Sequence, residues 1–424
     1  MPAKDSASRN WHQPSVWERD IRPLLPATYQ EQARRLGAWT RTRGVPAIDA
    51  LLQALLCYVL CARSLRQLGA WATLVGLGSI SDRAWSKRMR HSTTWALWLL
   101  GALIRPRSCG RPGPTQPLRI RVIDASMVRM KSHRGCSARL HCSYDLREQR
   151  LDQVVITDEH QGEGLQHFEL EPGDLIVADR WYCRPTTIQR VSAAQAQVLV
   201  RWHSTNLPLR TRDGAPFDVA AWLPTIAAET ADVAVMAANR PLRLLACRLS
   251  PEAAKREAYR RRRKAVKGGS QVQAQTLVYA AWLLLITSLP AADWSLPDLL
   301  TLYRARWQVE LLFKRIKQLL RLHGLPSGAY AANEAFLAWS LVAWALLDRR
   351  AEHAGERLPV SSRWHTTALL VDALRSMLWG HWTWTAISSH LEELSRYLRP
   401  SRPPHQLWSL NPILSHLESV PVCA

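Results

Sequence analysis

The first quarter of the chain has apolar residues at helical spacing. From residue 17 to about 105 the sequence predicts helices throughout, with AIDALLQALLCYVL and TTWALWLLGALI as their most apolar stretches. The segment RPRSCGRPGPTQP, residues 105–117, is rich in proline and glycine and predicts a linker. We therefore expect a helical N-terminal domain over residues 1–105.

After the linker the pattern changes to strands. LRIRVIDASMV, ARLHCSYDL, LDQVVIT and GDLIVADRWYC predict four strands, TTIQRVSAAQAQ a helix and VLVRW a fifth strand. This order, over residues 118–204, predicts the first part of an α/β domain with a mixed sheet. Residues 205–275 show short strands and loops and predict a β-rich insertion. TLVYAAWLLLITSLP then predicts a buried strand in the second part of the domain, residues 276–327, and Trp-rich helices follow over residues 328–424.

Charge adds a partner to this picture. The chain carries 56 Lys and Arg against 34 Asp and Glu, a net charge of +22, which favours a polyanion and above all nucleic acid. An anionic membrane surface is the alternative, but the apolar runs stop near a dozen residues, short of the roughly 18 that span a bilayer. With no apolar signal region, we expect a cytosolic protein whose eight cysteines are reduced.

Two basic segments could contact DNA. SLRQLGAWATLVGLGSISDRAWSKRMRH fits a helix-turn-helix with basic residues on its second helix, or equally a helical hairpin with a solvated basic face. AKREAYRRRRKAVKGGSQ fits a phosphate-contacting segment better, given the overall charge, than a solvated helix or a disordered loop. The candidate DNA-binding residues of these two segments are Arg83, Lys87, Arg88, Arg261 and Arg262.

YRARWQVELLFKRIKQLL, residues 303–320, predicts one helix with an unusual polar stripe. Beside its apolar face, five polar residues fall within an arc of roughly 80° at 100° per residue: Tyr303, Arg306, Glu310, Lys314 and Lys317. Taken alone, the stripe is best explained as a salt-bridge ladder on a solvated helix.

Two aspartates change that interpretation. Asp124 and Asp179 each end a predicted buried strand, where the sites of α/β proteins usually lie. Joined by Glu310 on a packed helix, they could hold two divalent cations about 3.5–4 Å apart, which drive in-line phosphoryl displacement. Oxygen ligands of this kind suit Mg²⁺, or Mn²⁺ in its place.

The order of these elements resembles the ribonuclease-H-like nucleotidyl transferases, and residues 303–317 make the resemblance specific. Tyr303, two residues, Arg306, three residues, Glu310, six residues and Lys317 match the YREK signature of bacterial insertion-sequence transposases. The stretch from LHCSYDL to ADRWYC also resembles the region that leads to the second aspartate of that group. The chain is thus similar to DDE transposases of the insertion-sequence-four type, firmly over residues 118–323.

The resemblance implies a role for each residue. Asp124, Asp179 and Glu310 would be the catalytic metal ligands, and Tyr303, Arg306 and Lys317 would hold the phosphates beside the scissile bond. Weaker candidates are Lys314, Arg180, which could instead form a surface salt bridge, and Trp282, which could stack on a flipped base or belong to the core. Glu163 could support the site. His133, Cys136, His141 and Cys142 have poor zinc spacing.

The activity implied is cut-and-paste transposition. The protein would bind the terminal inverted repeats of its element as a homodimer. It would cleave the strands with two Mg²⁺ ions through a hairpin intermediate and then join them to target DNA. It would act in the bacterial cytoplasm at the nucleoid, without a membrane partner. The alternatives are a non-cleaving DNA-binding repressor and a plain nuclease on the same fold.

Overall fold

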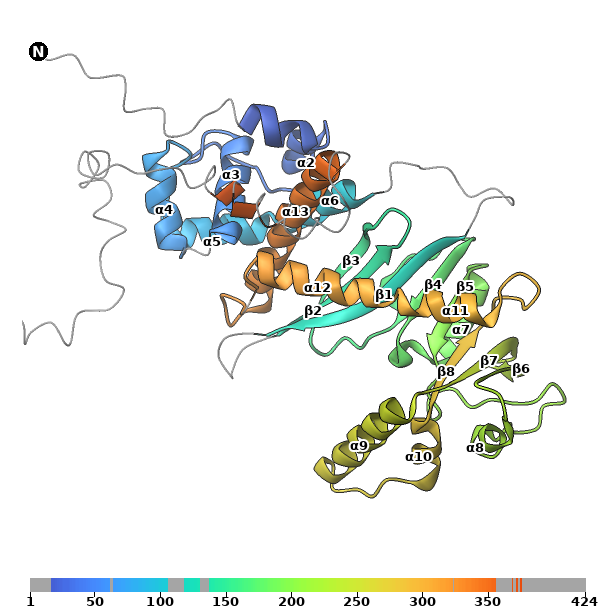
Figure 1. Ribbon diagram of the computed structural model, residues 1–424. Coiled ribbons are helices and arrows are strands. Elements are labelled where there is room, and N and C mark those ends of the chain that lie inside the picture. Colours follow the sequence, from blue (N-terminus) through green and yellow to red (C-terminus); the bar gives the residue numbers. More distant parts are fainter. Residues whose placement is uncertain are drawn as a thin grey trace, which may run out of the picture.

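The computed structural model describes most of the chain from residue 17 to residue 355. The described ranges are 17–61, 64–105, 118–129, 137–322 and 324–355, with residues 368, 371–372 and 374–375 beyond them. Figure 1 shows a helical part beside a large twisted sheet, with further helices at the far end of that sheet. His133, Cys136 and most of the predicted C-terminal helices lie outside the described residues.

The N-terminal part is helical, as its apolar periodicity predicts. Serine side chains begin two of the helices, because Ser64 accepts from the backbone of Gln67 in a capping box and Ser81 accepts from that of Ala84. The helical elements are Trp17–Ile21, Arg22–Leu24, α2 (Tyr29–Arg35), α3 (Ile48–Leu60), α4 (Leu65–Leu74), α5 (Asp82–His91) and α6 (Thr93–Ile104).

The long helix α13 (Tyr330–Gly355) packs among these N-terminal helices. Trp339 meets Trp95 edge to face at 5.2 Å between ring centroids, and its indole N–H donates to Ser92 Oγ at 2.9 Å. The two ends of the described chain therefore share one hydrophobic core. Within the described residues, Tyr330–Arg350 is long and apolar enough to cross a membrane, but 78% of its apolar window is buried in the protein, as in a core helix.

The sheet has eight strands in the order β3-β2-β1-β4-β5-β8-β7-β6. β1 runs parallel to β4, and β4 parallel to β5, whereas the other neighbours are antiparallel. The strands are β1 (Arg119–Val128), β2 (Ala138–Asp145), β3 (Arg150–Asp158), β4 (Asp174–Ala178), β5 (Gln197–Arg201), β6 (Thr230–Ala237), β7 (Arg240–Arg248) and β8 (Trp282–Thr287). The first five occur in the predicted order, with α7 (Pro185–Ala193) between β4 and β5. Short helical turns at Leu165–His167 and Arg180–Tyr182 flank β4.

The segment predicted as a β-rich insertion is mixed in structure. Its strands β6 and β7 extend the main sheet through β8. The rest is helical: α8 (Val219–Trp222), the turn Leu223–Thr225, α9 (Pro251–Lys267) and α10 (Ala274–Ala280). The predicted strand TLVYAAWLLLITSLP is wrong up to Ala280, which ends α10, and β8 begins only at Trp282. The basic run is helix α9, in which no residue is buried.

The predicted helix over residues 303–320 is also wrong as a single element. It is divided into α11 (Leu296–Arg304) and α12 (Trp307–Leu319), which lie end to end across the sheet in Figure 1. At the junction the backbone closes tighter turns three residues apart, such as Ala305 N–H to Leu302 O and Arg306 N–H to Tyr303 O. Tyr303 therefore belongs to α11, not to the helix that carries Glu310.

Candidate active site

Asp124 and Asp179 lie on neighbouring parallel strands. Ile123 of β1 pairs with Ala178 of β4, and each aspartate is the next residue along the chain. Asp124 was predicted to end its strand, but β1 continues past it to Val128, paired with β2. Asp179 does follow the last residue of β4 and caps the next turn, accepting from Trp181 N–H at 2.7 Å. The register alone thus brings two carboxylates together.

The starts of these strands are locked together by a buried charge network. Arg121, fully buried on β1, donates to Asp174 of β4 at 2.7 Å and lies 2.9 Å from Asp152 of β3. Arg119 adds a bond of 2.7 Å to Asp174. Buried ion pairs of this kind fix geometry more than they add stability. The network joins the starts of β1, β3 and β4, and the periodicity of the sequence did not reveal it.

Glu310 is joined to Asp124 through Arg306. The guanidinium of Arg306 donates to Glu310 at 2.5 Å, and its other terminal nitrogen lies 4.0 Å from Asp124. The predicted i,i+4 ion pair between Arg306 and Glu310 is therefore formed. It lies beside Asp124 of the sheet and not on a fully solvated helix face. The side chains of Asp124, Arg306 and Glu310 are 17%, 20% and 37% exposed, so the site is partly buried and open to solvent at Glu310.

Burial and like charge distinguish Asp124. Burial, reinforced by the neighbouring charge of Asp179, raises its pKa from 3.8 to about 7, although the Ala125 N–H and Arg306 oppose the shift. Glu163 belongs to the same cluster, because burial and then Asp179 raise its pKa as well. The auxiliary role of Glu163 stays a prediction.

The carboxylates of this site are suitable ligands for a divalent cation, although they do not lie close enough together here to coordinate one. Among the described residues, no group of three His, Cys, Asp or Glu side chains is close enough to hold an ion. The charge of Asp179 nevertheless raises the pKa of Asp124 and that of Glu163, and Arg306 supplies positive charge to Asp124 and Glu310. Crowded carboxylates of hard oxygen atoms suit Mg²⁺ or Mn²⁺ chemically.

Two lysines of the predicted stripe have different surroundings. Lys317 donates to Ser126 Oγ at 2.7 Å and to Met127 O at 2.8 Å, so it ties α12 to β1 just after Asp124. Lys314 is exposed. Tyr303 remains beside Arg306, whose guanidinium carbon lies 6.0 Å from the ring centroid, and burial raises the pKa of Tyr303 to about 12.

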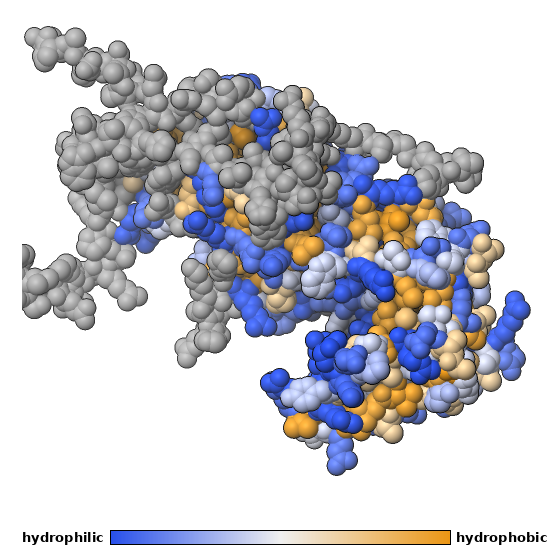
Figure 2. All heavy atoms as spheres, in the orientation of Figure 1, coloured by the Kyte–Doolittle hydropathy of each residue, from blue (hydrophilic) through white to orange (hydrophobic). Residues whose placement is uncertain are grey.

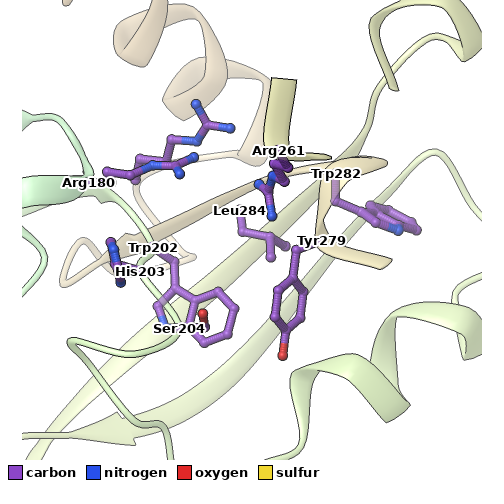
Figure 3. Close-up of a pocket in the computed structure, with 9 residues that line it drawn as sticks. Arg180, Trp202, His203, Ser204, Arg261, Tyr279, Trp282 and Leu284 are labelled. Carbon is purple, nitrogen blue, oxygen red and sulfur yellow. The ribbon is translucent and has the colours of Figure 1, made fainter. Parts of the chain in front are cut away.

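A pocket next to Asp179 combines cations with aromatic rings. Figure 3 shows Arg180 at one end and Trp282 at the other, with Arg261 and Tyr279 between them. Arg201 and Trp202 complete this wall, and Trp202 meets Tyr279 edge to face at 5.4 Å. Sequence reasoning missed three of these residues, because none of them carries a motif: Arg201 ends β5, Trp202 follows it and Tyr279 lies on α10.

Trp282 itself is mostly enclosed. Its side chain is 4% exposed, and the guanidinium carbon of Arg248 lies 4.3 Å from its ring centroid. Trp282 therefore packs in the hydrophobic core, which was one of the two predicted alternatives, and it also lines the pocket. By contrast, Trp181 and Trp307, also missed from the sequence, are 47% and 56% exposed beside Asp179 and Arg306.

The predicted basic segments place their residues differently. On α9, Arg262 is exposed, but Arg261 turns inward and donates to Glu257 and to Thr276 O. Figure 2 shows hydrophilic residues gathered over this helix. On α5, Arg83 and Lys87 are exposed, whereas Arg88 is only half-exposed. The connection of residues 75–81 between α4 and α5 is longer than the usual helix-turn-helix turn.

The unfavourable burial of the ionised Asp124 side chain predicts that the stability of the protein depends on pH. The folded pKa lies above the unfolded value, so the free energy of unfolding falls as pH rises from about 4 to about 7. Asp124→Asn should stabilise the metal-free protein at pH 8 by on the order of 2 kcal/mol and have little effect at pH 4.5. Thermal unfolding in EDTA measures this, with the exposed Asp293→Asn as control. An equal effect at both pH values would show that the charge of Asp124 is not strained.

Comparison with known proteins assigns the chain to a family. A family model for the transposase DDE domain matches residues 115–346. The putative transposase InsL of insertion sequence element IS186A, from Escherichia coli K12, is 31% identical over 334 residues, covering 76% of this chain and 90% of the relative. The transposase of insertion sequence element IS421 from Escherichia coli is 31% identical over 335 residues, with the same coverage. The mixed sheet and its helices agree with the ribonuclease-H-like fold that a DDE domain implies. The chain therefore belongs to the DDE transposases of insertion sequences and is consistent with the insertion-sequence-four type that its YREK spacing resembles.

Proposed function

We propose that this transposase moves its element by cutting and pasting DNA, through cleavage and strand transfer at one carboxylate site. The observation that carries the proposal is the register of β1 and β4, which sets Asp124 beside Asp179 next to the Arg306–Glu310 pair. DDE transposase domains generally use divalent metal ions. We assign Asp124, Asp179 and Glu310 as the ligands and Mg²⁺ as the metal, two ions to a site, with Mn²⁺ as a substitute.

The bound cations would polarise the scissile phosphate and activate the attacking hydroxyl. The chain's own residues orient the DNA around that chemistry. Arg306, a planar fork already beside Asp124 and Glu310, is placed to turn from Glu310 to a phosphate oxygen. Tyr303 lies next to Arg306 and can hold the adjoining phosphate through its hydroxyl. Lys317 fixes the strand that carries Asp124 against α12, and in this conformation its ammonium is directed to β1, not to a phosphate.

The pocket beyond Asp179 favours a hairpin intermediate. Aromatic rings stack on unpaired bases, and arginines bind the phosphates next to them. Trp202, Tyr279 and Trp282 with Arg180 and Arg261 provide both groups in one pocket, and Arg180 directly follows Asp179 in the chain. A base could stack on Trp282 only if Arg248 moved from its ring. The exposed Trp181 and Trp307 offer further stacking surfaces at the edge of the site.

The remaining contacts would distribute along the duplex. The exposed cations of α9, including Arg262, and of α5, including Arg83 and Lys87, are free to contact phosphates of the terminal inverted repeats and of target DNA. Lys314 is exposed one turn after Glu310 and can do the same. Two copies of the chain would hold two ends in the synaptic complex, in the bacterial cytoplasm at the nucleoid and without a membrane partner.

The test follows one labelled element end in a linear duplex with Mg²⁺. Wild-type protein should nick the strand and then convert the nicked end to a hairpin of doubled length on a denaturing gel. Trp282→Ala should nick within about threefold of wild type but form at least about tenfold less hairpin, because base stacking contributes about 1–3 kcal/mol. Trp222→Ala, outside the pocket, is the control.

The outcomes separate the alternatives. Nicking without any joined or hairpin product in wild type would identify a plain nuclease. DNA binding without nicking would identify a repressor derived from a transposase. Equal loss of nicking and hairpin in a Trp282→Ala protein that is folded and binds DNA like wild type would remove the pocket from the hairpin step.

A further inference from the structure

A short loop of the N-terminal part is held against α5 and carries exposed arginines. Residues 40–44, here the basic loop, are exposed, and they include Arg41 and Arg43. The loop is anchored at both ends. Trp39 N–H donates to Ala33 O, and Val45 is fully buried. The loop is therefore a defined feature of the surface.

The basic loop is pressed onto the α4–α5 connection. Gly44 O accepts from Ser79 N–H at 2.9 Å, and Gly44 has a φ of +76°. A Cβ atom there would lie 2.2 Å from Ile80 Cγ2, so no larger residue fits without displacement. The backbone of the loop thus keeps a set position next to α5.

Arg88 completes this attachment. Its guanidinium donates to Arg43 O at 2.7 Å and lies 5.8 Å from the Trp39 ring centroid. Burial lowers the pKa of Arg88, as expected for a side chain committed to the protein. Arg88 was predicted as a DNA-contacting residue, but its hydrogen-bonding group is directed to the loop.

The exposed cations of α5 form a separate face. Arg83, Lys87 and Arg90 fall within an arc of about 60° at 100° per residue, and Arg88 lies outside it. Within the described residues, neither Arg41 nor Arg43 forms an ion pair. In the described part of the chain, α5 thus presents a basic face, and the loop attached to the same helix through Arg88 adds two arginines that form no ion pair.

We propose that the basic loop enters the minor groove of duplex DNA next to the major groove occupied by α5, and that Arg88 is the positioning residue for it. This rests on the proposed DNA-binding function. A helix in the major groove brings a neighbouring arm to the adjacent minor groove, and arginine favours a narrow, A·T-like minor groove. The substrate class is a duplex whose minor groove lacks the guanine 2-amino group next to the bases faced by α5.

Inosine tests the groove directly. Duplexes of about 24 I·C pairs differ from G·C duplexes only by the missing 2-amino group of the minor groove, while the major-groove edge is unchanged. The full-length protein would be titrated against each labelled duplex in EDTA by fluorescence anisotropy. Wild type should bind the I·C duplex at least about fivefold more tightly, within the range of one groove contact.

The variants separate the two elements. The double variant Arg41→Ala, Arg43→Ala should bind both duplexes equally, and so should Arg88→Ala, which leaves both loop arginines in place. The double variant Arg83→Ala, Lys87→Ala should bind both more weakly and keep the ratio. Arg90→Ala is the matched control for Arg88→Ala on the same helix and should keep the ratio as well.

Each of the other outcomes would contradict a specific part of the proposal. If the loop variant keeps the wild-type ratio, or wild type binds both duplexes equally, the minor-groove inference is wrong and the DNA-binding proposal is unaffected. If Arg88→Ala keeps the wild-type ratio while the loop variant loses it, the positioning role of Arg88 is wrong. If wild type binds neither duplex at about 50 mM salt, where phosphate contacts are strong, the DNA-binding proposal fails together with this inference. Thermal unfolding of each variant checks that it is folded.

Discussion

Glu310→Gln should abolish strand cleavage, by a factor of at least about 10³, and leave DNA binding within about threefold of wild type. The amide keeps the shape of the side chain and its contact with Arg306 but loses the charge that a divalent cation needs. A loss of that size corresponds to about 4 kcal/mol of transition-state stabilisation. The measurement uses a supercoiled plasmid with a marker between the two element ends, incubated with Mg²⁺, and scores the excised fragment.

The control for this substitution lies outside the site. Glu252→Gln changes an exposed carboxylate in the first turn of α9 and should leave excision unchanged. If Glu310→Gln excises the marker at a rate within tenfold of wild type, Glu310 is not a metal ligand and the third carboxylate must be sought elsewhere, with Glu163 as the nearest candidate.

Arg306→Ala should reduce cleavage by about 100-fold at saturating Mg²⁺, while lowering the Mg²⁺ concentration that gives half the maximal rate. In this structure the Arg306 guanidinium forms an ion pair with Glu310 and lies beside Asp124, so it should compete with a metal ion for both carboxylates. Its removal should ease metal binding, and the rate should still fall because a phosphate contact of about 3 kcal/mol is lost. Initial rates over a Mg²⁺ series measure both effects.

Two further variants sharpen this result. Arg306→Lys should retain little of the activity, since a single ammonium cannot replace the planar fork. Arg304→Ala, at the exposed end of α11, is the control and should behave like wild type. A Mg²⁺ requirement that rises in Arg306→Ala would contradict the competition between Arg306 and the metal.

Local patterns in the sequence were enough to place the two aspartates. The apolar runs before Asp124 and Asp179 are strands, and the parallel pairing of those strands brings the two residues together. The place of Asp124 within β1 was wrong: it was expected to end the buried strand, but pairing with β2 continues the strand to Val128. Strand length depends on such neighbours, which a single stretch of sequence does not contain.

Tertiary packing accounts for the other differences. The break between α11 and α12 consists of a few tighter turns without proline or glycine, so no residue marks it. Lys317 has the spacing of a phosphate ligand, yet its ammonium finds Ser126 on a strand 191 residues away in sequence. Likewise Arg88 has the spacing of a helix face but binds the backbone of Arg43, 45 residues earlier. Periodicity gives the side of a helix on which a residue lies, not the partner that it meets there.

The central claim, that Asp124 is a ligand of the catalytic metal, is tested most directly by a change of metal preference. Asp124→Cys replaces a hard oxygen with a soft thiolate, which Mg²⁺ binds poorly and Mn²⁺ tolerates better. Cleavage of the element end would be measured in each metal for wild type, Asp124→Cys and Asp124→Asn. We predict that Asp124→Cys loses at least about 100-fold in Mg²⁺ and recovers at least about tenfold in Mn²⁺, whereas Asp124→Asn stays inactive in both. Full activity of Asp124→Cys in Mg²⁺, or equal inactivity of a folded, DNA-bound protein in both metals, would contradict the assignment.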